Sequence, residues 1–454
     1  MSSITLAQAA QWCGGKVEPK YAGVTFTGAN NDSRKLVPGQ LFLALEGVRD
    51  GHDFIPAAFQ KGAAAVLCRH MELDRPAIIV DDVRLALGQI ASHARLALDA
   101  QVVAVTGSVG KSTTKEMIAC VLEGSYLTSK TPANHNNDIG MPMSILAMPE
   151  DAEAVVLEMG MNHFGEISYL TGIGKPDIGV IVNIGTMHIE HLGSKEGILK
   201  AKMEIIDGMS AEGVLLVNGD DPYLRRAPEM SDVPVSFFGT APDCDVRATD
   251  IREGDGHITF TVNAGGELCE IYLPLTGLHY VSDALAAISA GMAMGVALEE
   301  IAERLAGFTT MAGRQEIFDV AGYRIIKDCY NAGPESMAAA LAVLGKQEGR
   351  KIAVLGDMLE LGTCADAEHY RVGRIAAENA DIVLSYGKYA PRVAAGAVTG
   401  GVDPDKILTF TDREAMTARL KATAAPGDAL LFKGSRMMKM ELVLEGFLKE
   451  TSGN

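Results

Sequence analysis

Continuous apolar runs recur along the chain, and each ends in glycine or in polar residues. The central part holds such runs at 154–160, 178–185 and 213–221, and a shorter run at 102–105 leads into a helical pattern. Strands buried on both faces of a parallel sheet have this composition, because neither face needs polar side chains. The pattern therefore predicts an α/β domain built on a parallel sheet.

Both flanking parts of the chain also alternate apolar strands with helical segments. The amino-terminal part has short apolar runs at 40–45, 63–68 and 77–80, and the carboxyl-terminal part has runs at 323–330, 351–358, 381–387 and 429–434. Residues 245–275 instead alternate around glycine turns, which predicts antiparallel strands before a helix. We predict three α/β domains in series, at 1–98, 99–312 and 313–454.

Charge and cysteine content narrow the class of protein. The 40 basic and 58 acidic side chains give a formal charge of −18, so a general basic surface for nucleic acid is not expected. The seven cysteines are scattered and form no C-x-x-C, which argues against a disulfide framework or a zinc cluster. With no signal peptide and no long apolar run, we expect a cytoplasmic protein without membrane insertion.

The stretch TGSVGKST at 106–113 resembles a phosphate-binding loop that lacks the usual first glycine. Gly107 and Gly110 allow the backbone to approach phosphate oxygens, Lys111 supplies a cation, and Ser112 supplies a hydroxyl for Mg²⁺. The loop follows a strand and opens a helix, so the positive helix end adds to an anion site. A chance Gly/Ser turn is the plainer alternative.

Two polar residues beyond strand ends are candidates for metal ligands. Glu158 closes the run at 154–160, and His188 lies just past the run at 178–185. Open α/β sheets hold their ligand groups at this edge. Each residue alone also fits a solvated or structural role, and His191 competes with His188.

Five stretches together resemble the Mur ligase family of bacterial cell-wall synthesis, and the resemblance covers nearly the whole chain. They are TGSVGKST, NHNNDIGMP at 134–142, LEMG at 157–160, NIGTMHIEHLGSKEGILKAKMEI at 183–205 and DCYNAGPESM at 328–337. The shortened G-x-x-G-K-S loop is this family's form. Three more stretches, at 32–54, 354–362 and 433–441, resemble the branch of the family that adds a D-alanyl-D-alanine dipeptide.

The resemblance implies both an architecture and a reaction. The fold would be α/β with three domains: an amino-terminal UDP-binding domain, a central P-loop ATPase-like domain with a parallel sheet, and a carboxyl-terminal Rossmann-like domain. ATP, with Mg²⁺, would phosphorylate the carboxylate of UDP-MurNAc-tripeptide, and the amine of D-alanyl-D-alanine would then displace phosphate. A monomer without a nucleic-acid partner is expected.

The resemblance also assigns roles to residues by position. The catalytic set would be Lys111, Glu158, His188, Lys202 and Arg314. Nucleotide contacts would come from Gly107, Ser108, Val109, Gly110, Lys111, Ser112, Thr113, His279, Asp283, Arg314 and Asp328. Substrate contacts would come from Ser33, Arg34, Asn134, Asn136, Asn137 and Asn331. The metal ligands would be Ser112, Glu158, His188 and Lys202, the last as a carbamate, although Lys202 also fits an exposed helix lysine.

Two departures from the family pattern bear on these roles. Tyr280 and Asp283 stand where relatives have asparagines beside adenine; an ionised Asp283 would only accept hydrogen bonds, and Tyr280 could stack on the base. Gly333 replaces an asparagine near the amine substrate. The alternatives are another Mur-type or folylpolyglutamate-type ligase, a P-loop switch protein, and a degenerate relative that only binds nucleotide. The absence of N-K-x-D and L-S-G-G-Q signatures weighs against a GTPase or a transporter ATPase.

Overall fold

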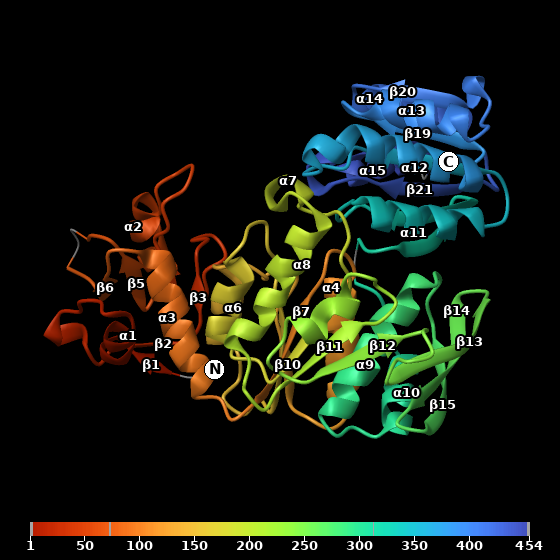
Figure 1. Cartoon of the computed structure of the whole chain (residues 1–454). Helices are drawn as coiled ribbons and strands as arrows, with labels where there is room; N and C mark the ends of the chain where they lie inside the picture. Colours follow the sequence, from red (N-terminus) through yellow and green to blue (C-terminus); the bar gives the residue numbers. More distant parts are fainter. Residues whose placement is uncertain (1–2, 72–73, 312, 452–454) are drawn as a thin grey trace.

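The computed structural model describes residues 3–71, 74–311 and 313–451 of the 454. Three main sheets follow one another along the chain (Figure 1). The first has the order β3-β4-β5-β6, is parallel throughout, and consists of β3 (Ala29–Asn30), β4 (Leu41–Leu43), β5 (Ala65–Cys68) and β6 (Ala77–Ile79). A short antiparallel pair, β1 (Ile4–Thr5) and β2 (Thr25–Phe26), lies beside it with α1 (Leu6–Cys13).

The second sheet has nine strands in the order β15-β14-β13-β12-β11-β10-β7-β9-β8. The strands are β7 (Gln101–Thr106), β8 (Thr128–Lys130), β9 (Ala154–Glu158), β10 (Ile178–Ile181), β11 (Val214–Asn218), β12 (Val235–Gly239), β13 (Val246–Gly254), β14 (His257–Ala264) and β15 (Glu267–Leu273). They are parallel from β8 to β13, whereas β13, β14 and β15 pair antiparallel. Both predictions, the parallel centre and the antiparallel stretch at 245–275, are confirmed.

The reason for the continuous apolar runs is visible in β7. Val102 and Ala104 pack into one hydrophobic core and Val103 and Val105 into the other, so both faces of the strand are buried. Two helices, α4 (Lys111–Leu122) and α9 (His279–Ala293), contribute to the second core. On the other face, α3 (Val83–Leu96) joins the first sheet to the second by packing on α5 (Gly140–Leu146) and α6 (Glu166–Gly174).

The third sheet has the order β16-β17-β21-β18-β19-β20, with only β16 antiparallel. Its strands are β16 (Glu316–Val320), β17 (Tyr323–Asp328), β18 (Lys351–Gly356), β19 (Ile382–Tyr386), β20 (Ile407–Phe410) and β21 (Ala429–Lys433). Its helices are α11 (Pro334–Gly345), α12 (Ala365–Asn379), α13 (Ala390–Thr399), α14 (Arg413–Thr423) and α15 (Met440–Thr451). The four strand runs predicted here and the helix after Pro334 are confirmed.

The remaining helices are α2 (Ile55–Gln60), α7 (Ile189–Leu192), α8 (Lys195–Met203) and α10 (Leu298–Ala306). In the described ranges, no helix combines the length and apolarity needed to cross a bilayer. The predicted domain limits at 1, 312 and 454 fall on residues outside those ranges, so the exact boundaries stay a prediction. Residues at the carboxyl ends of β7, β9 and β10, together with residues at the start of α11, line the candidate site.

Candidate active site

The loop between β7 and α4 needs a glycine at Gly110 for two reasons. Its φ of 85° lies in the left-handed region, which disfavours side chains. A Cβ there would also lie 2.5 Å from Oδ1 of Asp283 and 3.3 Å from Cγ1 of Val182. Gly110 is the N-cap of α4, so the loop delivers its backbone amides to the positive end of that helix.

Asn183 holds the loop in shape from the neighbouring strand. Its Oδ1 accepts from the amides of Ser108 at 3.1 Å and Val109 at 3.0 Å, and its Nδ2 donates to the Val109 carbonyl at 3.0 Å. The Gly185 amide donates to the Ser108 hydroxyl at 2.8 Å. Sequence analysis missed Asn183; the only signal was its place just after β10, whose partner strand is β7.

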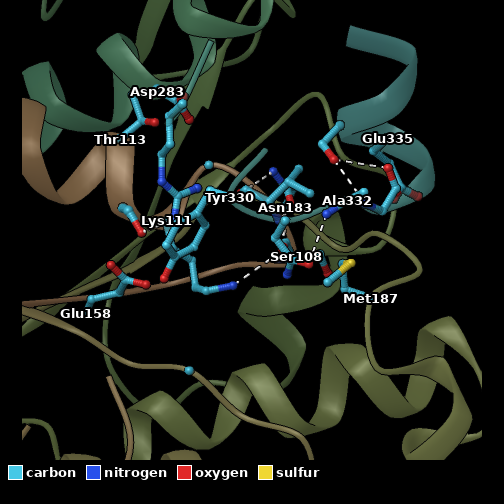
Figure 2. A pocket seen from close by; sticks show the side chains of 18 of the residues that line it. Ser108, Lys111, Thr113, Glu158, Asn183, Met187, Asp283, Tyr330, Ala332 and Glu335 are labelled. Carbon is cyan, nitrogen blue, oxygen red and sulfur yellow. Dashed lines mark hydrogen bonds between the residues drawn. The ribbon is translucent and has the colours of Figure 1, made fainter. Parts of the chain in front are cut away.

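Lys111 and Ser112 lie where the loop opens into the cavity. The Lys111 ammonium donates to the carbonyls of Gly107 at 2.7 Å and Ser108 at 3.3 Å, so it sits inside the curl of the loop (Figure 2). Arg314, from beyond the second sheet, donates from Nη2 to the Ser112 hydroxyl at 2.8 Å. The Arg314 guanidinium also lies 4.1 Å above the centre of the Tyr330 ring, a cation–π contact that fixes its plane. Two cations therefore converge on the loop, an arrangement suited to phosphate oxygens.

Glu158 ends β9 beside this loop and is 2 % exposed. Its Oε1 accepts from Asn136 Nδ2 at 2.8 Å, whereas the buried Oε2 has no hydrogen-bond partner among the described residues. Lys115 Nζ lies 3.8 Å from Oε2 and donates to the Thr131 carbonyl at 2.7 Å. Lys115 is fully buried in α4 and was not predicted, because nothing in a lysine's sequence context announces burial.

His188 has a left-handed backbone, with φ of 63°, and lines the same cavity. Its Nδ1 lies 2.8 Å from Oε2 of Glu360, within ion-pair distance, and this contact lowers the pKa of the Glu360 carboxyl. Lys202, on α8, is 2 % exposed, so the alternative of an exposed helix lysine is wrong. Burial, together with the charge of Lys111, holds the pKa of Lys202 well below its usual range.

The residues present fit a Mg²⁺ ion that takes only one or two ligands from the protein. Within the described ranges, no three His, Cys, Asp or Glu side chains gather closely enough to hold a metal ion by themselves. The unpartnered Oε2 of Glu158 is a suitable single carboxylate ligand. Because Mg²⁺ keeps waters and substrate phosphates as ligands, one or two protein groups beside a phosphate loop are sufficient.

Asp283 and Tyr280, both on α9, line the cavity where the family pattern has asparagines. Asp283 is buried, accepts from the Thr114 hydroxyl at 3.0 Å, and burial raises its pKa to about 7. In its protonated form this carboxyl can donate as well as accept a hydrogen bond, whereas its ionised form only accepts. Tyr280 is 3 % exposed and its ring packs 4.1 Å from that of His279, which leaves little ring face for an adenine.

Most predicted residues meet in one cavity of about 520 Å³. The predicted residues that line it are Ser108, Val109, Gly110, Lys111, Ser112, Thr113, Asn134, Asn136, Asn137, Glu158, His188, His279, Asp283, Arg314, Asp328 and Asn331. Lys433, which was not predicted, also lines it; this 2 %-exposed cation pairs with Asp328 and donates to the Asn331 carbonyl at 3.0 Å. The amide of Asn137 instead caps the turn before α5, accepting from Gly140 N at 2.8 Å.

Four predicted residues do not line this cavity. They are Gly107, Lys202, Ser33 and Arg34. Gly107 and Lys202 lie behind it, close to Lys111. The Arg34 side chain is 86 % exposed and pairs with Asp32 at 2.8 Å in the amino-terminal part of the chain.

A phosphate-binding loop on the parallel second sheet, with an arginine reaching it from the start of the third sheet's unit, is typical of a nucleotide-dependent enzyme. Family models match the chain over 25–95 (Mur ligase family, catalytic domain), 105–291 (Mur ligase middle domain) and 313–436 (Mur ligase, glutamate ligase domain). The protein therefore belongs to the Mur ligase family.

Individual relatives cover nearly the whole chain. The UDP-N-acetylmuramoyl-tripeptide–D-alanyl-D-alanine ligase of Bacillus subtilis is 40 % identical over 440 residues, 95 % of each chain, and that of Escherichia coli is 36 % identical over 452 residues, 98 % of each. Among solved structures, MurF from Acinetobacter baumannii superposes with a TM-score of 0.91 at 31 % identity and 99 % coverage of both chains. MurF ligase from Thermotoga maritima, solved in complex with ADP, gives 0.83 at 30 % identity, covering 94 % of this chain and 98 % of that one.

Proposed function

We propose that the protein uses ATP to join the carboxylate of UDP-MurNAc-tripeptide to the amine of D-alanyl-D-alanine, releasing ADP and phosphate. The observation that carries the proposal is the meeting of Lys111, Ser112 and Arg314 with Glu158 in the lining of one cavity. The substrates are those in the names of the two relatives, whose sequences align with this chain over 95 % or more of their length.

The reaction needs activation because a carboxylate is a poor acyl donor. Transfer of the γ-phosphoryl group of ATP to the carboxylate forms an acyl phosphate and ADP. The free amine of the dipeptide then attacks the acyl carbon, and collapse of the tetrahedral intermediate expels phosphate and leaves an amide bond. The protein's part is positioning and charge neutralisation, which supply most of the catalysis in phosphoryl transfer.

The residues divide this work by position. Lys111 and Arg314 neutralise the phosphate oxygens, and Asn183 holds the loop in shape beside them through the amides of Ser108 and Val109. Glu158, with its unpartnered Oε2, Ser112 and His188 are the groups that would hold Mg²⁺, and the ion would supply charge neutralisation beside the phosphate loop. Asn134 and Asn136 line the wall on the Glu158 side of the cavity, and Asn331 lines the α11 side.

Lys202 belongs to this proposal through its chemistry as an amine. A buried lysine with a lowered pKa has a large neutral fraction, and only the neutral amine adds CO₂ to form a carbamate. We propose that Lys202 carries this modification, since a carbamate would place an anion near the charge of Lys111. Mass spectrometry of the intact protein in bicarbonate, with loss of the added mass in Lys202→Gln, tests this.

The proposal also covers the UDP-binding residues, the domain limits and the state of the protein in the cell. Ser33 and Arg34 would bind the UDP moiety, and the chain would divide into domains at 1–98, 99–312 and 313–454. The exposed guanidinium of Arg34 supports an anion-binding role. We further propose a cytoplasmic monomer, whose carboxyl-terminal domain closes over the bound substrates.

Phosphate release from the purified protein with Mg-ATP tests the function directly. UDP-MurNAc-tripeptide and D-alanyl-D-alanine are added separately and together, with Lys111→Ala as the matched inactive variant. Release that needs both substrates and disappears in Lys111→Ala supports the ligase. Release that ignores both, or no release at all, refutes it in favour of a nucleotide-binding relative; release with glutamate as the amine instead would indicate a folylpolyglutamate-type ligase.

A further inference from the structure

Three consecutive residues of the second sheet's site loop, 186–188, each contact the carboxyl-terminal part of the chain. The Thr186 hydroxyl donates to both carboxylate oxygens of Glu335, at 3.1 Å each. Nδ1 of His188 lies 2.8 Å from Oε2 of Glu360. Met187 stands between these two residues in the chain and lies so close to Gly333 that a Cβ there would overlap its Sδ, so each of the three residues contacts the third sheet's unit.

The Met187 side chain occupies the space beside Gly333. A Cβ added to Gly333 would overlap Sδ of Met187 and lie 3.1 Å from its Cγ. Met187 is only 6 % exposed, so its thioether fills the space that a side chain at 333 would need. The missing asparagine is therefore more than a lost polar contact, because its room is occupied by a neighbour from the opposite side of the cavity.

The His188 contact is held by unusual backbone on both sides. His188 and Glu360 both have a φ of 63°, in the left-handed region that ordinary side chains rarely adopt. Such a conformation persists where the surroundings enforce it and is enriched at functional sites. Next to this contact, α7 packs on the short helix Gly362–Cys364. This packing anchors the segment around Glu360 against the loop that holds His188.

We infer that Glu360 is a positioning residue for His188, and that docking of the carboxyl-terminal unit on residues 186–188 sets the orientation of this imidazole in the cavity. With Nδ1 facing Glu360, Nε2 is the ring nitrogen left to serve as a ligand. A carboxylate on the far nitrogen fixes the tautomer and raises the basicity of a ligating histidine. The inference rests on the proposed function, in which His188 helps to hold the metal.

Metal affinity, not turnover, is the direct readout. Mn²⁺ binding is measured by electron paramagnetic resonance of the free ion, with the full-length protein and a non-hydrolysable ATP analogue. The variants are Glu360→Gln, Glu360→Asp, His188→Ala and the double variant Glu360→Gln/His188→Ala. The matched control is Glu378→Gln, which changes an exposed carboxylate on α12 of the same unit.

Glu360→Gln is expected to weaken Mn²⁺ binding about tenfold, the usual effect of removing such a partner, while Glu360→Asp regains part of the loss. The double variant should bind no more weakly than His188→Ala, because both changes act on the same imidazole. An Mn²⁺ affinity in Glu360→Gln or His188→Ala equal to that of the Glu378→Gln control would overturn the inference. If the wild-type protein shows no ligase activity but the Mn²⁺ affinities of the variants change as expected, the result counts against the proposed substrates alone. The titration needs no turnover.

Gly333→Asn supplies an independent arm. It restores the family residue at the cost of displacing Met187, so it is expected to weaken Mn²⁺ binding with Glu360 intact. Combining it with Met187→Ala makes room for the asparagine and should return the affinity close to that of the wild type. No change in Gly333→Asn alone, with the protein folded by circular dichroism, would show that the 186–188 contact does not set the imidazole.

Discussion

Replacing Asp283 by asparagine is expected to stabilise the protein at alkaline pH and to change its pH dependence. The carboxyl is buried beside Gly110, with the Thr114 hydroxyl as its hydrogen-bond donor. Burial raises its pKa from 3.8 to about 7. Asparagine has nearly the same shape, keeps an oxygen for Thr114, and has no charge to bury.

The sign and size of the effect follow from linkage. Between these two pKa values the folded protein binds a proton that the unfolded chain has released, so the free energy of unfolding falls as pH rises. The stabilising contribution is complete below 3.8 and is lost by the time pH passes about 7. A difference of about 3 pKa units corresponds to about 4 kcal/mol in total, of which about 2.5 kcal/mol falls between about pH 5 and about pH 8.

Urea denaturation at those two pH values, followed by tryptophan fluorescence and circular dichroism, measures the change. The difference in stability between Asp283→Asn and the wild type should grow by about 2.5 kcal/mol from the lower to the higher pH. Asp232→Asn, at an exposed position of the same sheet unit, should leave the pH dependence as it is. Parallel pH profiles for the wild type and Asp283→Asn would refute the reasoning, because they would mean that the buried carboxyl does not titrate in this range.

Three further substitutions test buried or stacked cations. Lys115→Met should lower the free energy of unfolding by about 3–5 kcal/mol, measured by urea denaturation, because it removes the buried cation that pairs with Glu116 and Glu158; an unchanged midpoint would contradict this. Arg314→Lys should reduce kcat/KM for ATP about tenfold in the phosphate-release assay, since an ammonium lacks the planar stack on Tyr330; activity equal to the wild type would show that charge alone suffices. Arg95→Met should lower the free energy of unfolding by about 2–4 kcal/mol, because it removes the donors to two buried carbonyls and one part-buried carbonyl; thermal denaturation without a shift would exclude that role.

Sequence pattern predicted most of the strands that are buried on both faces and missed several half-buried strands, among them the inner strand β12. Runs such as 102–105 and 154–160 are buried on both faces, so their apolar composition is unambiguous. The strands β8, β16 and β20 lie at sheet edges and have half-buried or exposed residues, so no apolar run marks them. Strand ends were also extended too far: β10 stops at Ile181, and the apolar residues after it form the site loop.

The candidate site was predictable where a role depends on local sequence. The loop glycines, Lys111 and Ser112 work through the spacing of a strand, a turn and a helix, all of which the sequence displays. The contacts of Asn183, Lys433 and Glu360 depend on which strands and helices become neighbours in space. Burial was equally hidden, since Lys115 and Lys433 have the composition of surface residues and become buried only through packing.

The hydrogen bond from Arg314 to Ser112 joins residues 202 positions apart in the chain. At a synthesis rate of about 5–20 residues per second, the arginine emerges from the ribosome about 10–40 s after the loop that it closes. The parallel strands around the loop, and Asn183 that shapes it, are complete well before then. Nucleotide bound to this half-built site would stabilise the nascent second sheet by mass action, so that the substrate of the finished enzyme also acts as a ligand for its folding.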